Sequence, residues 1–180
     1  SNIAEDKERS NLIIKVLKKL AINSCRNILV ISDRISQLRY LHNALPEISG
    51  LFIGSLKNHQ LEESKTKQIL LGTYALVNEG FNLPKLNCLV FATPRSSITQ
   101  AVGRIYRKKH TITPIIVDFF DNFSIFNGQY YKRRTIYKKN INECVFITCN
   151  NNDSEQLLDS DDDSTLSNTL KLCLLDSDSD

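Results

Sequence analysis

The sequence predicts an α/β fold in which a parallel β-sheet is sandwiched by helices. Short, continuous apolar runs stand at residues 27–33, 88–92 and 114–119. Such runs are typical of strands that are buried on both faces of a parallel sheet. Segments with helical spacing of apolar residues alternate with these runs, and that alternation indicates helices on the faces of the sheet.

The elements are expected in a regular order along the chain. The first helix is expected at 4–22, where apolar residues recur at helical spacing opposite a row of lysines. The second helix, at 35–45, should end before Pro46. The later elements are expected as a strand at 50–53, a helix at 58–66, strands at 68–71 and 88–92, a helix at 97–106 and a strand at 114–119.

The last part of the chain differs in composition from the rest. Residues 123–139 are rich in Tyr, Lys and Arg and are expected to form a helix, followed by an edge strand at 144–148. From residue 150 onward Asn, Asp and Ser dominate, so 150–180 is expected to be a mostly disordered acidic tail. Within this tail, 166–175 is a candidate for a short helix that forms against a partner. The chain therefore divides into a folded domain at 1–149 and a tail.

Charge is distributed unevenly between these two parts. Residues 1–152 hold 22 Lys and Arg against 11 Asp and Glu, whereas 153–180 hold one Lys and nine Asp and Glu. A basic domain favours a polyanionic partner, of which nucleic acid is the commonest, although a merely soluble basic surface gives the same count. The acidic tail is expected to solvate the protein, to bind a protein partner, or to compete with nucleic acid for the basic surface.

Composition also argues against several classes of protein. No apolar run approaches the roughly 18 to 20 residues of a membrane span, and the polar first ten residues are not a secretory signal. The five cysteines form no C-x-x-C pair and do not cluster with the three histidines, so no metal site is expected. Their scattered spacing suits an intracellular, reducing compartment.

The clearest chemical pattern is Q-x-x-G-R-x-x-R at residues 100–107, shortly after a predicted strand. Its four defined residues share one face of a helix because they are spaced i, i+3, i+4 and i+7. They are Gln100, Gly103, Arg104 and Arg107. The glycine leaves room for close approach, and two adjacent guanidinium groups suit the charge of a transferring phosphoryl group, the arginine-finger role. A helix with two exposed arginines is the plainer alternative.

A second pattern lies upstream, at residues 69–84, where a buried strand runs into Gly72 and Thr73. Backbone amides and the Thr73 hydroxyl after a strand can hold a phosphate. Further on, Gly80 permits a backbone conformation that other residues avoid. Glu79, taken alone, would be no more than a solvated charge.

Together these segments resemble motifs V and VI of the superfamily 2 helicases, in the same order and about 16 residues apart. Upstream, 28–34 resembles motif IV and 52–55 resembles motif IVa. The resemblance covers residues 4–120 and implies the second, C-terminal RecA-like lobe, a fold of the P-loop NTPase type. Within the superfamily the chain is similar to the RecG-, UvsW- and XPB-like branch and to helicases of nucleocytoplasmic large DNA viruses. A viral protein of this kind would act in the virion or in a virus factory of the host cytoplasm.

The resemblance implies roles for individual positions. Arg104 and Arg107 match arginines that reach across to ATP held by the first lobe, and Gln100 matches a residue that couples the nucleotide to the cleft between the lobes. The positions that match the nucleotide side of the cleft are Glu79, Gly80, Asn82 and Gly103. The positions that match contacts to the nucleic-acid backbone are Arg34, Gly54, Ser55 and Thr73.

The chain departs from the family pattern in two respects. The family often has Asp where this chain has Asn82, which can hydrogen-bond but carries no charge, so a ribose or arginine contact there should be weaker. The chain also has no G-x-x-x-x-G-K-[ST] and no acidic D-E-x-H-type box. ATP and Mg²⁺ are therefore expected to be held mainly by an N-terminal lobe outside this chain. The absence of Met, the initiator included, fits a piece of a longer protein, and the isolated chain is expected to hydrolyse no ATP.

Three functions compete at this point. The favoured one is the motor lobe of an ATP-dependent helicase or translocase that acts on nucleic acid, DNA rather than RNA, together with its first lobe. A non-catalytic module that grips nucleic acid is the second, and an RNA helicase stays open beside it. The third, an ordinary nucleotide-binding enzyme, lacks support because no glycine-rich loop follows the first strand.

The basic helix at 123–139 has two interpretations. It can line the nucleic-acid track, with tyrosines that stack on bases and Arg133 and Arg134 on phosphates. Alternatively, its tyrosines pack on the sheet and leave a solvated basic face, which is the interpretation that we favour.

Overall fold

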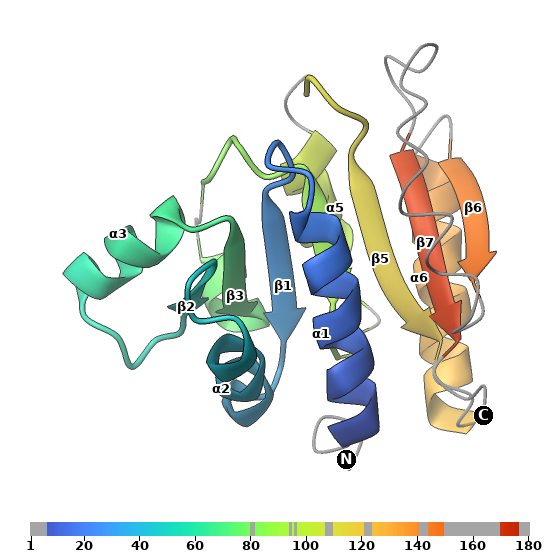
Figure 1. The fold of residues 1–180 in the computed structure, drawn as a ribbon. Helices are drawn as coiled ribbons and strands as arrows, with labels where there is room; N and C mark the ends of the chain where they lie inside the picture. The colour runs from blue at the N-terminus through green and yellow to red at the C-terminus, as the bar shows by residue number, and fades with distance from the viewer. Residues whose placement is uncertain are drawn as a thin grey trace.

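The computed structural model describes residues 7–79, 82–93, 95, 97–106, 110–120, 124–140, 144–149 and 170–176. Within these residues, seven strands form one sheet in the order β2-β3-β1-β4-β5-β7-β6, and every neighbouring pair is parallel (Figure 1). The strands are β1 (Ile28–Ser32), β2 (Ser49–Phe52), β3 (Ile69–Thr73), β4 (Cys88–Phe91), β5 (Ile115–Phe120), β6 (Cys144–Cys149) and β7 (Leu170–Asp176). The predicted parallel α/β fold is confirmed.

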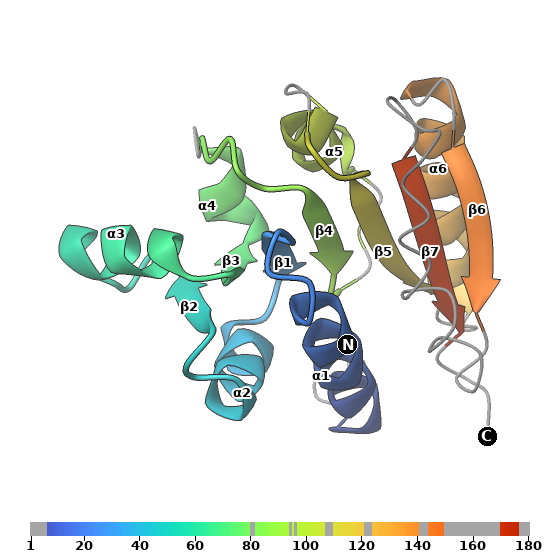
Figure 2. The ribbon, with the colours of Figure 1, turned by 45° about the horizontal axis from the view of Figure 1, so that its top comes forward.

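Helices cover both faces of this sheet. They are α1 (Lys7–Ala21), α2 (Ile35–Ala44), α3 (Asn58–Thr66), α4 (Tyr74–Asn78), α5 (Thr99–Tyr106) and α6 (Ser124–Asn140). Figure 2 shows α1 and α2 on one face and α4, α5 and α6 on the other. No helix of the described ranges has the length and apolar character needed to cross a membrane.

The continuous apolar runs arise because each central strand faces two separate cores. All five residues of β1 are buried. Ile28 and Val30 pack with α1 and α2, whereas Leu29 and Ile31 pack with α4 and α5. Successive side chains of a strand point to opposite faces, so a strand between two helical layers has no polar position, and the pattern seen in the sequence follows.

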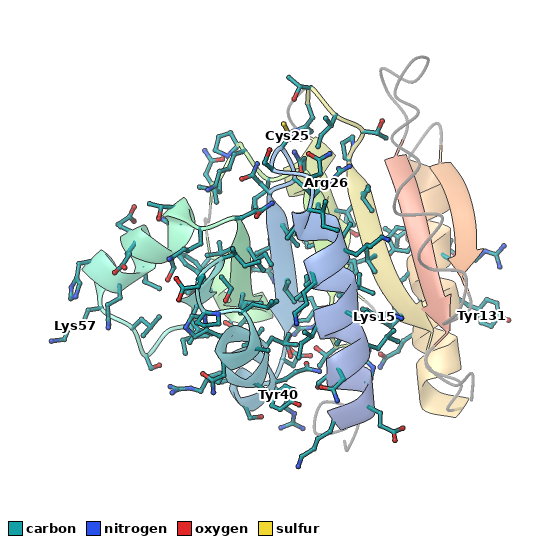
Figure 3. The ribbon with its side chains drawn as sticks, in the orientation of Figure 1. Lys15, Cys25, Arg26, Tyr40, Lys57 and Tyr131 are labelled. Atoms are coloured by element: carbon teal, nitrogen blue, oxygen red, sulfur yellow. The ribbon has the colours of Figure 1, made fainter. Side chains whose placement is uncertain are left out.

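The helix α6 is fixed to the sheet by a buried ion pair. Arg133 donates from Nε to Asp118 Oδ2 (2.7 Å) and from Nη2 to Asp118 Oδ1 (3.0 Å), and the hydroxyl of Tyr137 donates to Asp118 Oδ2 (3.1 Å). Arg133 is therefore not available to phosphates, which corrects one interpretation of this helix. Tyr131, by contrast, is exposed and points away from the sheet (Figure 3).

This network is electrostatically balanced. Burial alone would lower the pKa of Arg133, but the charge of Asp118 and its hydrogen bond outweigh burial and raise that pKa. Burial raises the pKa of Tyr137 well above its usual value, and the Asp118 carboxylate adds to the shift. Arg133 thus stays charged beside Asp118, and Tyr137 stays a neutral donor.

The end of the chain differs from the sequence prediction. Residues Leu170–Asp176 form strand β7, which lies between β5 and β6, and not the short helix considered for 166–175. The apolar residues of 170–175 gain ladder hydrogen bonds from two neighbours there, which no local periodicity in the sequence reveals. The prediction of disorder concerns in addition 150–169 and 177–180, which lie outside the described residues.

Candidate functional site

The predicted nucleic-acid contacts all follow strands that end at the same edge of the sheet. In the parallel register, Ser32 of β1 pairs with Thr73 of β3, and Phe52 of β2 pairs with Gly72 of β3. The order β2-β3-β1 therefore places the residues after these strands in one row, with neighbouring strands about 4.8 Å apart. We call this row, Gly54–Ser55, Thr73 and Asp33–Arg34, the carboxyl edge.

At the opposite edge of the sheet, polar side chains form hydrogen bonds within the protein. The Gln68 amide nitrogen donates to the carbonyls of Ala21, Asn23 and Arg26 at 3.0 to 3.1 Å. The Arg26 guanidinium donates to the carbonyl of Thr113 at 2.7 Å, and Figure 3 shows Arg26 near the start of β1. These side chains form hydrogen bonds with backbone carbonyls of the loops and are therefore not available to a ligand at this amino edge. The carboxyl edge is the better candidate for a binding site.

Arg34 stands where β1 leads into α2. Its backbone is extended at the N-cap of α2, its amide donates to the Ser32 hydroxyl at 3.0 Å, and its side chain is exposed. Ser32 in turn donates its hydroxyl hydrogen to Gln37 Oε1 at 2.8 Å, and both residues are buried. The backbone of Arg34 is thus held by a buried pair while the guanidinium is free to reach a phosphate.

Thr73 and Gly54–Ser55 complete the row. The Thr73 oxygen caps α4 by accepting from the amide of Leu76 at 3.4 Å, and this leaves the hydroxyl hydrogen available for donation. Gly54 and Ser55 are both exposed. A Cβ added at Gly54 would meet nothing within 4 Å. The packing of the lobe therefore does not require a glycine there, and the space beside it is open.

The structure reveals further edge residues that the sequence analysis did not single out. Arg95 follows β4, and its Nη1 lies 3.5 Å from Oδ1 of Asp33. Its guanidinium lies over the ring of Tyr74, 4.7 Å from the ring centroid. The sequence does show that Asp33 and Arg95 each come shortly after a buried strand. Their proximity could not be predicted, however, without knowing that the two strands are neighbours in the sheet.

The predicted nucleotide-facing helix is α5. Ile98, Ala101 and Val102 are buried against the sheet, whereas Gln100 is exposed. A Cβ at Gly103 would meet nothing within 4 Å, so the surface beside it is open in this lobe. Arg104 lies one turn after Gln100 on the described backbone of α5. The side chain of Arg104 and the whole of Arg107 lie outside the described residues.

The remaining predicted positions follow α4. Glu79 is the C-cap of α4 and is exposed, and its amide donates to the carbonyl of Ala75 at 3.2 Å. Asn82 is exposed as well. Gly80 lies outside the described residues. The structure therefore gathers the nucleic-acid candidates in one row and leaves Glu79, Asn82 and Gln100 at the surface without a described partner group.

Comparison with known proteins shows what this chain is similar to. No family model matches the chain. A protein of Acanthamoeba polyphaga mimivirus named as an ATP-dependent RNA helicase is 33% identical over 147 residues, which are 77% of this chain and 28% of that protein. A protein of African swine fever virus with the same kind of name is 33% identical over 98 residues, 53% of this chain and 19% of that protein.

Solved structures support the same fold. The C-terminal part of the Fun30 ATPase domain matches with a TM-score of 0.56 at 16% identity, over 68% of this chain and 43% of that one. The Hef helicase domain of Pyrococcus furiosus matches with a TM-score of 0.54 at 17% identity, over 70% of this chain and 28% of that one. The chain is thus similar to viral helicases in sequence, and its fold is that of a RecA-like helicase lobe. This helicase lobe spans less than a third of the length of the two viral relatives.

Proposed function

We propose that this helicase lobe grips the backbone of a nucleic-acid strand along its carboxyl edge and supplies part of an ATP site shared with a first lobe. The observation that carries the proposal is the row formed by Gly54–Ser55, Thr73 and Arg34 on three adjacent strands. The exposed Ser55 hydroxyl, the half-buried Thr73 hydroxyl and the exposed Arg34 guanidinium suit successive phosphates of one strand and read no base sequence. The full-length protein would then act as an ATP-dependent helicase or translocase.

The ATP side of the proposal rests on α5. Its exposed Gln100, the open surface at Gly103 and the following Arg104 suit a partner that approaches from outside this lobe. The chain lacks a phosphate-binding loop of its own, so the first lobe would hold most of the nucleotide and its Mg²⁺. Bound ATP would supply the transferable phosphoryl group. The residues of this lobe would contribute hydrogen bonds and, from Arg104 and Arg107, positive charge.

We propose DNA as the substrate, in line with the branch of the superfamily that the sequence resembles. The names of two viral relatives specify RNA helicases, so RNA is the rival substrate. Contacts to the backbone alone do not discriminate between the two, because discrimination needs a contact to the 2′-hydroxyl.

The test uses a protein that contains this lobe and its first lobe. ATP turnover is measured with and without single-stranded DNA and RNA, for the wild type and for Arg104→Ala, Arg107→Ala and Lys18→Ala. We expect nucleic acid to stimulate turnover and both α5-region substitutions to reduce it by about 10³-fold or more while binding of nucleic acid survives. Lys18 is exposed on α1, so its substitution should leave turnover unchanged.

Two results would contradict the proposal. Turnover that is indifferent to both arginines would make this lobe a binding module, the second candidate function. Measurable turnover by the 180-residue chain alone would show that the ATP site is not shared. The nucleic acid that stimulates more strongly identifies the substrate.

A further inference from the structure

Arg95 lies next to the β1 end of the carboxyl edge, although no motif includes it. It follows β4, and β4 is the neighbour of β1. Its guanidinium approaches Asp33, which follows β1, at 3.5 Å and covers the ring of Tyr74, which follows β3. Arg95 thus stands beside the row that contains Arg34 and Thr73.

Three hydrogen bonds hold Arg95 and the nearby Thr93. The Tyr74 hydroxyl donates to the carbonyl of Thr93 at 3.0 Å, and the amide of Asp33 donates to the Thr93 hydroxyl oxygen at 2.9 Å. Nη1 of Arg133 approaches the carbonyl of Arg95 at 3.4 Å. A segment held in this way presents its side chain at a defined place, which is what a binding residue needs.

The side chain itself is only loosely engaged. Arg95 is 43% exposed and Asp33 is 46% exposed. Their 3.5 Å separation is longer than the roughly 2.7 to 2.9 Å of a charge-assisted hydrogen bond, and exposed pairs of this kind add little to stability. The ring of Tyr74 covers one flat face of the guanidinium and leaves its in-plane N–H groups accessible.

We propose that Arg95 is a phosphate-binding residue of the carboxyl edge, held by Asp33 until a phosphate of the bound strand takes the place of that carboxylate. A guanidinium binds carboxylate and phosphate with the same planar fork of donors, so the exchange needs no new geometry. The inference rests on the proposed function, because it adds a residue to the same nucleic-acid site.

Arg133 differs from Arg95 because its ion pair is buried and cannot exchange its carboxylate for a phosphate. Its pair with Asp118 has an N–O distance of 2.7 Å, and both side chains are 1% exposed. A phosphate cannot reach a buried pair without unfolding the contact of α6 with the sheet. Of Arg95 and Arg133, only Arg95 can be reached by a strand.

Asp33 has a predictable effect on the same site. Its carboxylate adjoins Arg34 in the chain, so it repels phosphates that approach the edge and competes for Arg95. Asp33→Asn removes the repulsion and releases Arg95 while the stacking on Tyr74 is kept. We therefore expect Asp33→Asn to tighten binding and Arg95→Ala to weaken it.

The experiment measures binding of the 180-residue chain to a fluorescent single-stranded oligonucleotide of mixed sequence over a range of salt concentrations. Each phosphate contact contributes about 0.7 to the slope of log K against log salt for single strands. Arg95→Ala should reduce that slope by about 0.7, as should Arg34→Ala, whereas Arg95→Lys should keep the slope. Lys18→Ala and Glu47→Gln are exposed charge controls away from the carboxyl edge and should match the wild type.

The outcomes separate the inference from the proposed function. If Arg34→Ala reduces the slope and Arg95→Ala does not, the inference is overturned and the proposed function stands. If the wild type shows no salt-dependent binding, both are overturned. If thermal unfolding shows that Arg95→Ala is damaged, the effect of Asp33→Asn is measured with and without Arg95→Gln. A gain in affinity that is lost when Arg95→Gln is added supports the inference. No gain, or the same gain with and without Arg95→Gln, overturns it.

Discussion

Arg133 and Asp118, 15 residues apart in the sequence, form a two-point ion pair in the interior, with N–O distances of 2.7 and 3.0 Å. The pair joins α6 to β5, and Tyr137 adds a third hydrogen bond to the same carboxylate. A carboxylate in this position needs its partners, because removal from water is costly for an isolated charge.

Replacement of Arg133 by Ala should therefore destabilise the lobe strongly. Removal of one partner of a buried pair leaves the other charge uncompensated, at a cost of about 3 to 5 kcal/mol. Urea unfolding followed by circular dichroism measures the effect. The adjacent Lys132 is exposed, and Lys132→Ala should stay within about 0.5 kcal/mol of the wild type. A loss for Arg133→Ala no larger than that of Lys132→Ala would show that the pair does not hold α6.

Two glycines provide a matched pair of substitutions. A Cβ at Gly50 would lie 2.6 Å from Cα of Ser64, so Gly50→Ala must push β2 and α3 apart, whereas a Cβ at Gly54 meets nothing within 4 Å. We expect Gly50→Ala to cost about 1 to 3 kcal/mol and Gly54→Ala to be neutral within about 0.5 kcal/mol. Thermal unfolding of both variants checks this, and equal stabilities would contradict the packing of α3 on β2.

His42 should make the stability of the lobe dependent on pH. Burial, and secondly the charge of Lys67, lower the pKa of His42 below its usual 6.5. Because of this lowered pKa, His42 takes up a proton more readily in the unfolded chain than in the folded lobe. This contribution to stability is complete above about pH 6.5 and is lost as the pH falls through the lowered pKa. The Ser49 hydroxyl donates to the carbonyl of Leu45, so Nδ1 of His42 is the donor in its 2.8 Å contact with Ser49.

An NMR titration of the imidazole measures this pKa directly. The wild type should titrate below pH 6.5, and Lys67→Gln should move the midpoint upward because it removes the nearby positive charge. A midpoint at or above 6.5 in the wild type would contradict the partial burial of His42 beside Ser49 of β2.

The acidic end of the chain should be tested by neutralisation rather than by deletion. Strand β7 pairs with β5 and with β6, so deletion of 150–180 removes hydrogen bonds on both sides. We expect that deletion to cost at least about 2 kcal/mol, equivalent to about 4 to 8 °C in Tm for a domain of this size. Replacement of the four aspartates within 159–163 by Asn keeps β7. If the tail competes for the basic surface, that variant should bind nucleic acid more tightly at unchanged Tm.

Much of the architecture could be predicted from local patterns. Each strand of the core, from β1 to β5, coincides with an apolar run, and α1, α2 and α6 lie where periodicity or composition placed them. These elements are predictable because burial on two faces, or on one helical stripe, leaves a direct trace in residue type. β7 left no such trace, since a short apolar segment fits a helix or a strand until its neighbours are known.

The resemblance to helicases, the order of the elements and the residues that follow each strand could be predicted from the sequence, because they depend on residue type and spacing along the chain. Which of the charged residues share a surface became clear only from the folded structure. The fold buries Arg133 against Asp118 and places Arg95 beside Asp33 and Tyr74. The physical reason is the strand order β3-β1-β4, which brings three loops together from positions about 20 to 40 residues apart. No periodicity within a single element encodes that order.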